Sequence, residues 1–338
     1  MLAPPHSMEL IRKKQVQSYQ NAVRDFIRKQ SQIYACAAAK NIYQLKILNL
    51  PNTTARLSNI QTNIRSLTPE KLLAKFMDYA QEKGGGNYKS LDPKNFDPGD
   101  FQDFIGNKFM VLDNIFELLK LHIENNDQDK IEDKFSKICN YYELISIVLA
   151  NILGIEEFST IFQSAEWLEE IQWYKAILSK TTNQTSEVKD YLKELQSKFT
   201  AADEEILGMD NEQLEEEFKR INEGYNVPDY SHKLSYEFDY QEFYDFCSNI
   251  GVGTVIMIFS GFYDKLLRGE QINLIYFNKI TLNLPEYYRK GMILLCCFIG
   301  KDLVYPNKGV VGGIIKLPQP TKPAIEQIDN PSYYENSL

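Results

Sequence analysis

The side chains that could do chemistry are few and widely spaced in this sequence. There are three histidines (His6, His122 and His232) and five cysteines (Cys36, Cys139, Cys247, Cys296 and Cys297). His232 has Asp229, Ser231 and Ser235 near it, so the segment 224–240 is the best place for a nucleophile and a base. A surface loop without any catalytic role would have the same composition as residues 224–240. We therefore predict no catalytic residue, and an enzyme of unrecognised type with its site on 224–240 is the alternative hypothesis.

The spacing of cysteine, histidine and acidic residues does not indicate a metal or cofactor site. The cysteines and histidines never occur at zinc-ligand spacing, and an odd number of cysteines without a framework is typical of reduced thiols. Four acids, Asp127, Asp129, Glu132 and Asp133, stand where a helix should begin, and there acids complement the positive helix end. Further acids at 202–205 and 212–218 are interpreted as solvated. We expect no metal and no cofactor.

Two glycine-rich stretches resemble nucleotide-binding loops only in part. In "EKGGGNYKS" (82–90), Tyr88 occupies the place where a phosphate loop needs glycine, and a helix is predicted before it instead of a strand. We interpret this stretch as a helix end followed by a linker. In "NIGVGTV" (249–255) the third glycine of a dinucleotide loop is missing. Two glycines in an apolar helix instead favour close helix packing.

Charge is distributed unevenly along the chain. Residues 1–66 contain ten basic and two acidic residues, a net charge of +8, whereas the whole chain has −9 and residues 67–338 therefore have −17. A basic arm on an acidic body predicts an anionic partner for the arm: an acidic protein, an anionic membrane surface, or the body itself. The acidic body argues against nucleic acid. Arg24, Arg28 and Lys29 are our candidate binding residues in the arm.

Aromatic and acidic residues alternate in "YEFDYQEFYDF" (236–246). Such a stretch could dock a basic groove or helix, because aromatic rings supply anchors and acids supply steering. The candidate anchors are Tyr236, Phe238, Tyr240 and Phe243. The alternative is an amphipathic helix start whose rings enter the core.

Hydrophobic spacing of three and four residues predicts a mostly α fold. We expect a long, coiled-coil-like basic arm (1–83), a linker (84–97), an antiparallel multi-helix acidic body (98–315) and a flexible tail (316–338). Helices are expected at 69–83, 98–125, 128–153, 156–180, 187–199, 211–222, 240–267 and 285–299. The composition of 271–285 favours a strand, with a helix as the alternative. As a strand it could form one short strand pair with "VVGGIIKLP" near the C-terminus.

Function is predicted from these features together. We expect a non-catalytic helical interaction or scaffold protein, acting in a protein assembly with protein partners. An apolar, uncharged run at 246–263 raises the alternative of a membrane-associated subunit, although a buried core helix explains it as well. We expect an intracellular, cytoplasmic location. Import into mitochondria is the alternative, because the N-terminus is basic and poor in acids.

Overall fold

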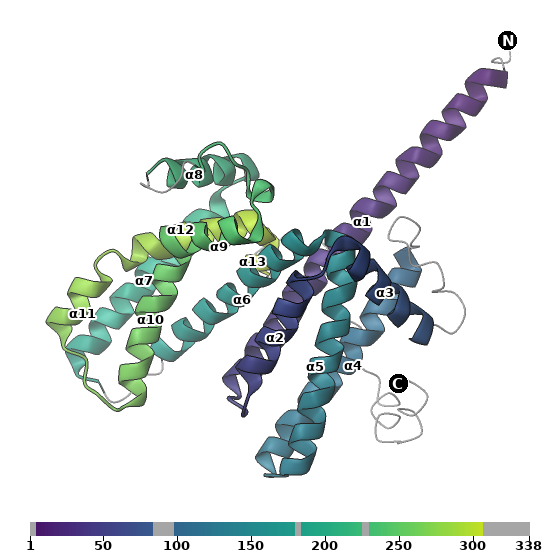
Figure 1. Cartoon of the computed structure of the whole chain (residues 1–338). Helices are drawn as coiled ribbons and strands as arrows, with labels where there is room; N and C mark the ends of the chain where they lie inside the picture. The colour runs from purple at the N-terminus through teal and green to yellow at the C-terminus, as the bar shows by residue number, and fades with distance from the viewer. Residues whose placement is uncertain (1–4, 84–97, 180–183, 225–229, 307–338) are drawn as a thin grey trace. The chain divides into compact units, whose positions relative to one another are not determined.

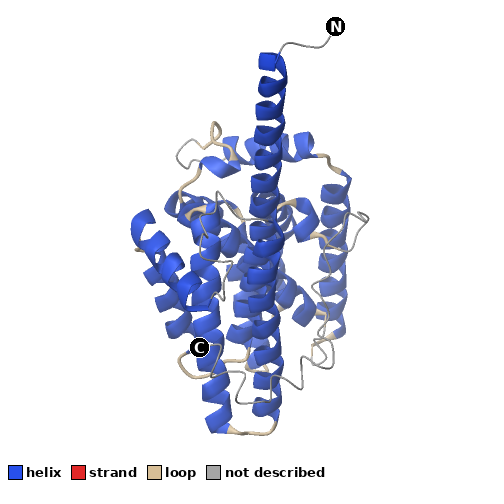
Figure 2. Cartoon of the chain, turned by 90° about the vertical axis from the view of Figure 1, so that its right-hand side faces the viewer, coloured by secondary structure: helices blue, strands red, loops and turns tan. Residues whose placement is uncertain are grey.

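Every regular element that the structure describes is a helix. The computed structural model describes residues 5–83, 98–179, 184–224 and 230–306, and Figures 1 and 2 show helices joined by loops in these ranges. The predicted mostly α fold is confirmed. The expected linker 84–97, the "VVGGIIKLP" stretch and the tail 316–338 lie outside the described residues.

Internal contacts divide the chain into two compact units. Of the described residues, unit 1 comprises 5–38, 49–83 and 98–155, and unit 2 comprises 39–48, 156–179, 184–224 and 230–306. The long helix α1 (Pro5–Ile47) therefore contributes to both units. Within unit 1, the helices between residues 53 and 153 follow α1 in the chain.

Unit 1 is organised around α5 (Gln128–Leu153). It pairs with α4 (Pro98–Glu124), and both α2 (Thr53–Arg65) and α3 (Pro69–Lys83) pack against it. α5 ends at Gly154, whose φ of 91° is accessible to glycine without steric cost. The buried face of α5 repeats at helical spacing and includes Ile131, Phe135, Ile138, Tyr142 and Ile145.

Unit 2 is organised around α12 (Leu284–Ile299). Six consecutive residues, 291–296, are buried, as expected for a helix that is covered on all sides. Its neighbours are α7 (Ser186–Gly208), α8 (Asn211–Glu223), η2 (Ser235–Glu237), α9 (Tyr240–Ile250), α10 (Val252–Leu267), α11 (Leu274–Thr281) and α13 (Lys301–Val304). The aromatic helix α6 (Ile155–Leu178) packs on α10, where Trp173 meets Tyr263 at 4.6 Å between ring centroids.

The expected single helix 240–267 is wrong, because the chain bends by 58° between α9 and α10. The break is at Gly251. A Cβ atom there would lie 3.2 Å from the carbonyl oxygen of Tyr287, so glycine permits this close approach to α12. Gly291 of α12 faces Val252 in the same contact. The interpretation of the glycines as helix-packing residues is supported, whereas the continuous helix is not.

The strand expected at 271–285 is also wrong. Asn273 caps α11 by accepting a hydrogen bond from the N–H of Tyr276 at 3.2 Å. Phe277 and Thr281, one turn apart, are 0% and 1% exposed. A helix places both on one inward face, so packing overrides the β-propensity of the isoleucines and aromatics. Helix α7 also continues beyond the expected end at residue 199, because Ala202 and Ile206 extend its buried face.

Candidate binding site

An open cavity of about 250 Å³ lies in unit 2 between α8, the segment before α9 and the C-terminal end of α12. This volume is below the roughly 300–1,000 Å³ of small-molecule sites, and it suits one large side chain better than a cofactor. Three buried side chains, Leu214, Phe218 and Cys296, contribute to its wall. The other lining residues are Asn211, Glu215, Leu234, Ser235, Tyr236 and Cys297.

Tyr236 stands at the cavity with 75% of its surface exposed. Its position follows from its neighbours in the chain. The carboxylate of Glu237 accepts a hydrogen bond from the N–H of Leu234 at 2.9 Å, which closes the short η2 turn. Phe238 is 6% exposed and packs against Phe246 at 5.0 Å between centroids. Burial of Phe238 thus anchors the segment and leaves Tyr236 pointing outward.

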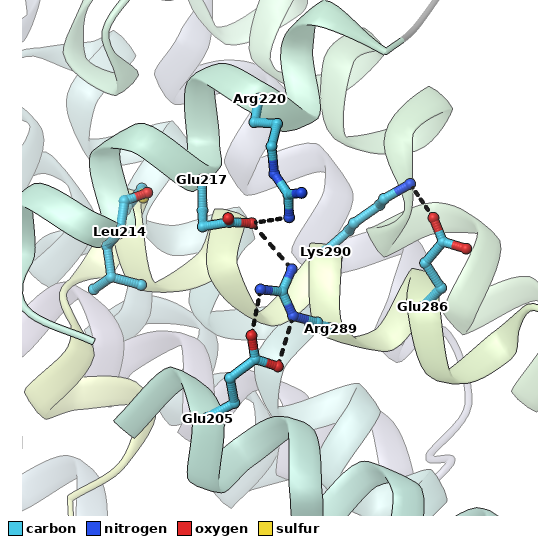
Figure 3. A network of polar contacts seen from close by, with 8 residues as sticks. Glu205, Leu214, Glu217, Arg220, Glu286, Arg289 and Lys290 are labelled. Atoms are coloured by element: carbon cyan, nitrogen blue, oxygen red, sulfur yellow. Dashed lines mark hydrogen bonds and ion pairs between the residues drawn. The ribbon is translucent and has the colours of Figure 1, made fainter. Parts of the chain in front are cut away.

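Helix α8 is tied to its neighbours by one arginine, as Figure 3 shows. Arg289 of α12 donates to both carboxylate oxygens of Glu205 on α7, at 2.9 and 2.6 Å, and to Glu217 of α8 at 3.1 Å. Arg220 donates to the same oxygen of Glu217 at 2.6 Å. Burial alone would raise the pKa of Glu217, but its bonds to Arg220 and Arg289 together outweigh burial and lower it. The bond to Arg289 lowers the pKa of Glu205. The network fixes α8 against α12, which form two walls of the cavity.

The two thiols in the cavity are neutral near pH 7. Burial, reinforced by the charge of Glu215, raises the pKa of Cys297 to about 12. Burial also raises the pKa of Cys296. The thiolate is the reactive form, so neither side chain is an activated nucleophile. The Cys297 thiol instead donates to the carbonyl of Leu214 at 3.8 Å, which links α12 to α8.

The elements around the cavity are acidic. Helix α8 contains five acidic and two basic residues, a net charge of −3, and residues 234–246 contain four acids and no base. Some of these carboxylates are paired, as Glu215 is with Lys219 at 3.2 Å. The arrangement offers an apolar recess inside an acidic border, which suits a ligand with an apolar group and positive charge.

The predicted binding residues are not brought together as one group. Tyr236 lies at the cavity, and Tyr240 begins α9 with its backbone N–H bonded to Glu156 at 2.6 Å. Phe238 and Phe243 are buried, so these two rings belong to the core, as the alternative interpretation had it. Arg24, Arg28 and Lys29 are exposed on α1 in unit 1.

Sequence reasoning placed Leu234 and Ser235 only in the segment of the alternative enzyme site (224–240), and it did not single out the lining residues from α8 and α12. Leu214 and Phe218 look like ordinary core positions of α8, and the Cys296–Cys297 pair lies in an apolar run. No local pattern joins residues that are 80 positions apart. The available clues were the segment 224–240 and the mixture of tyrosine and acids from 236 onward.

A second polar cluster shows that the acids at 202–205 are not all solvated, which corrects the expectation above. Asp203 has 15% of its side chain exposed and accepts from Lys175 at 3.1 Å. The hydroxyls of Tyr288 and Tyr305 also donate to it, at 2.7 and 2.8 Å. This closed set of bonds links α6, α7 and α12 to the residue after α13.

Among the described residues, no group of three or more His, Cys, Asp or Glu side chains could hold a metal ion. Within the same ranges no single helix is long and apolar enough to cross a membrane, although the bent pair α9–α10 passes that test by length and composition. Phe246, Val255, Phe259 and Phe262 of this pair are buried inside unit 2.

Comparison with known proteins identifies no relative. No protein-family model, curated protein or solved structure matches this chain.

Proposed function

We propose that this protein is a non-catalytic interaction module of a protein assembly, and that it docks a basic partner segment at the cavity of unit 2. The observation that carries the proposal is the apolar recess beside Tyr236 with acidic helices around it. An apolar side chain of the partner would enter the recess, and its basic neighbours would face the acids of α8.

The recess is suited to binding for two physical reasons. Leu214 and Phe218 are held in place by the core, so little entropy is lost when a partner side chain contacts them. Tyr236 is already ordered by the burial of Phe238, and an exposed tyrosine at the edge of a recess is a typical anchor residue. The neutral thiols of Cys296 and Cys297 add polarisable lining to this recess.

A labelled peptide with the sequence of residues 8–30 is a suitable probe. It has six basic and two acidic residues, and its apolar residues recur at helical spacing. Fluorescence anisotropy of this peptide with the full chain should show binding that weakens as salt is added. Replacing Arg24, Arg28 and Lys29 by glutamine in the peptide should weaken binding further.

Two variants of the full chain locate the site. Tyr236→Ala should weaken peptide binding roughly tenfold, because the rim anchor is lost. Tyr244→Ala removes a tyrosine of α9 that is 42% exposed and does not line the cavity, and it should bind as the unchanged chain does. Equal affinity of the two variants, or absence of peptide binding to the unchanged chain, would contradict the proposal.

A further inference from the structure

A second exposed surface lies on α11, away from the cavity. Four large side chains form what we call the α11 ridge: Leu267 at the end of α10, Ile275 and Tyr276 in α11, and Leu282 at the C-cap of α11. Their exposed fractions are 66%, 84%, 54% and 76%, respectively. Isolated exposed apolar residues are ordinary, but four within 16 positions at the α10–α11 turn are not. Figure 1 shows α11 and α8 well apart, and α11 precedes the N-terminal end of α12 whereas the cavity adjoins its C-terminal end.

The ridge is exposed although α11 itself is firmly anchored. Phe277 packs against Phe262 of α10 at 4.2 Å between centroids. The hydroxyls of Tyr191 and Thr281 are 2.7 Å apart, which ties α11 to α7. The side chain of Gln184 bonds the backbone at Glu270 and Ile272, at 3.2 and 3.1 Å. The inward face of α11 is therefore fixed by these contacts, and Ile275, Tyr276 and Leu282 remain exposed on its outer side.

The charge around the ridge differs from that of the rest of the body. No acidic residue occurs from 271 to 285, although residues 67–338 have a net charge of −17. Lys265 lies over the Tyr276 ring at 4.7 Å, and Arg268 and Lys279 are both exposed. Glu270 lies 3.3 Å from Arg268, and the nearest acids on either side in the chain are Asp264 and Glu286, of which Glu286 is paired with Lys290. The ridge thus combines aliphatic side chains with tyrosine and cationic groups.

We propose that the α11 ridge docks on the surface of an anionic lipid bilayer. Ile275 and Leu282 would enter the boundary of the acyl chains, and Tyr276 would lie at the headgroup level. Lys279 is one turn from both aliphatic residues on the same helix face. Its long stem can follow them while its ammonium reaches the anionic headgroups.

A bilayer fits this surface better than a protein groove does. A protein that buried Ile275 and Leu282 would also bury Lys279 and would need an acid placed to meet it. The fluid headgroup layer provides anionic groups at any position. The inference is independent of the cavity, because the ridge and the cavity share no residue.

Co-sedimentation of the full chain with phosphatidylcholine vesicles, with and without phosphatidylserine, tests the proposal. The double variant Ile275→Ser/Leu282→Ser should lower partitioning onto phosphatidylserine vesicles roughly tenfold or more. Lys279→Gln should lower it about fivefold on these vesicles and leave binding to neutral vesicles unchanged. All these positions are exposed, so the variants should fold, and circular dichroism checks this.

Leu121→Ser, at a half-exposed leucine of α4, is the matched control and should bind vesicles as the unchanged chain does. Tyr236→Ala should do the same, which separates this test from that of the cavity. The proposal is overturned if the unchanged chain does not bind anionic vesicles, or if the double variant binds them equally well. It is also overturned if the double variant alters only self-association in lipid-free sedimentation, since the ridge would then be a protein interface.

Discussion

Glu170 should make the stability of unit 2 depend on pH. Burial, together with the charge of Glu166, raises the pKa of Glu170 from its ordinary value of 4.5 to about 7, while Lys46 opposes the shift. Glu166 is itself paired with Lys46 of α1, and its side chain is only 7% exposed. Glu169, whose pKa burial also raises, and Tyr43 complete the group where residues 39–48 meet α6. An extra negative charge is poorly accommodated among these residues.

The sign and the size of the effect follow from this shift. A carboxyl whose pKa is higher in the folded state binds its proton more tightly there than in the unfolded state. The stability that Glu170 contributes is therefore fully present below pH 4.5 and is lost as pH rises through 7. The full shift corresponds to about 3 kcal/mol of the free energy of unfolding. Because the side chain is partly exposed, solvent screening reduces this to about 2 kcal/mol.

Replacing Glu170 by glutamine keeps a neutral side chain of the same shape at every pH. We expect Glu170→Gln to be about 2 kcal/mol more stable than the unchanged chain at pH 8, with the difference vanishing near pH 4.5. Urea unfolding followed by tryptophan fluorescence reports on unit 2, because Trp167 and Trp173 both lie in α6. The exposed Glu204→Gln on α7 is the control. A difference that is the same at both pH values, or a less stable variant at pH 8, would refute the reasoning.

Four further variants test the packing. Arg289→Met should lower the free energy of unfolding by about 2–3 kcal/mol in the same urea assay, because it leaves Glu217 partly buried with a weaker partner. Arg220→Met, at a side chain that is 68% exposed, should lower it by less than about 1 kcal/mol. Ser146→Ala should raise stability by about 1 kcal/mol by circular dichroism, because its fully buried hydroxyl has no hydrogen-bond partner among the described residues. Gly251→Ala should lower the melting temperature, at a cost of about 1–3 kcal/mol, since the added methyl would press on the Tyr287 carbonyl. Equal costs for the two arginines, a destabilised Ser146→Ala, or an unchanged melt for Gly251→Ala would contradict these expectations.

Much of the helical structure could be predicted because its causes are local. Thr68 and Pro69 mark the start of α3, Gly154 marks the end of α5, and Asp210 begins α8 with a capping box. Each of these residues acts on backbone groups within a few positions of itself. The "NND" connector before it and Gly154 after it likewise gave α5 its exact range, because turn residues act on the adjacent helix ends.

The candidate site could be predicted only in part. The composition of 236–246 indicated that Tyr236 could bind, but the same pattern included Phe238 and Phe243, which are buried. An aromatic ring has the same local pattern whether it faces the core or the solvent. Which way it faces depends on the helices that cover it, here α8 and α12 around Phe238, and these are distant in the chain.

By itself, the sequence determined the helical class, most helix ends and the opposition of a basic N-terminal region to an acidic remainder. Tertiary structure alone decided that the chain bends at Gly251, that α11 is a helix, and that residues 211–218, 234–236 and 296–297 enclose one cavity. The physical reason is the range of the interactions. Helix caps and apolar periodicity act within one or two turns of a helix. The bend at Gly251, the helical state of α11 and the cavity result from contacts between residues far apart in the chain.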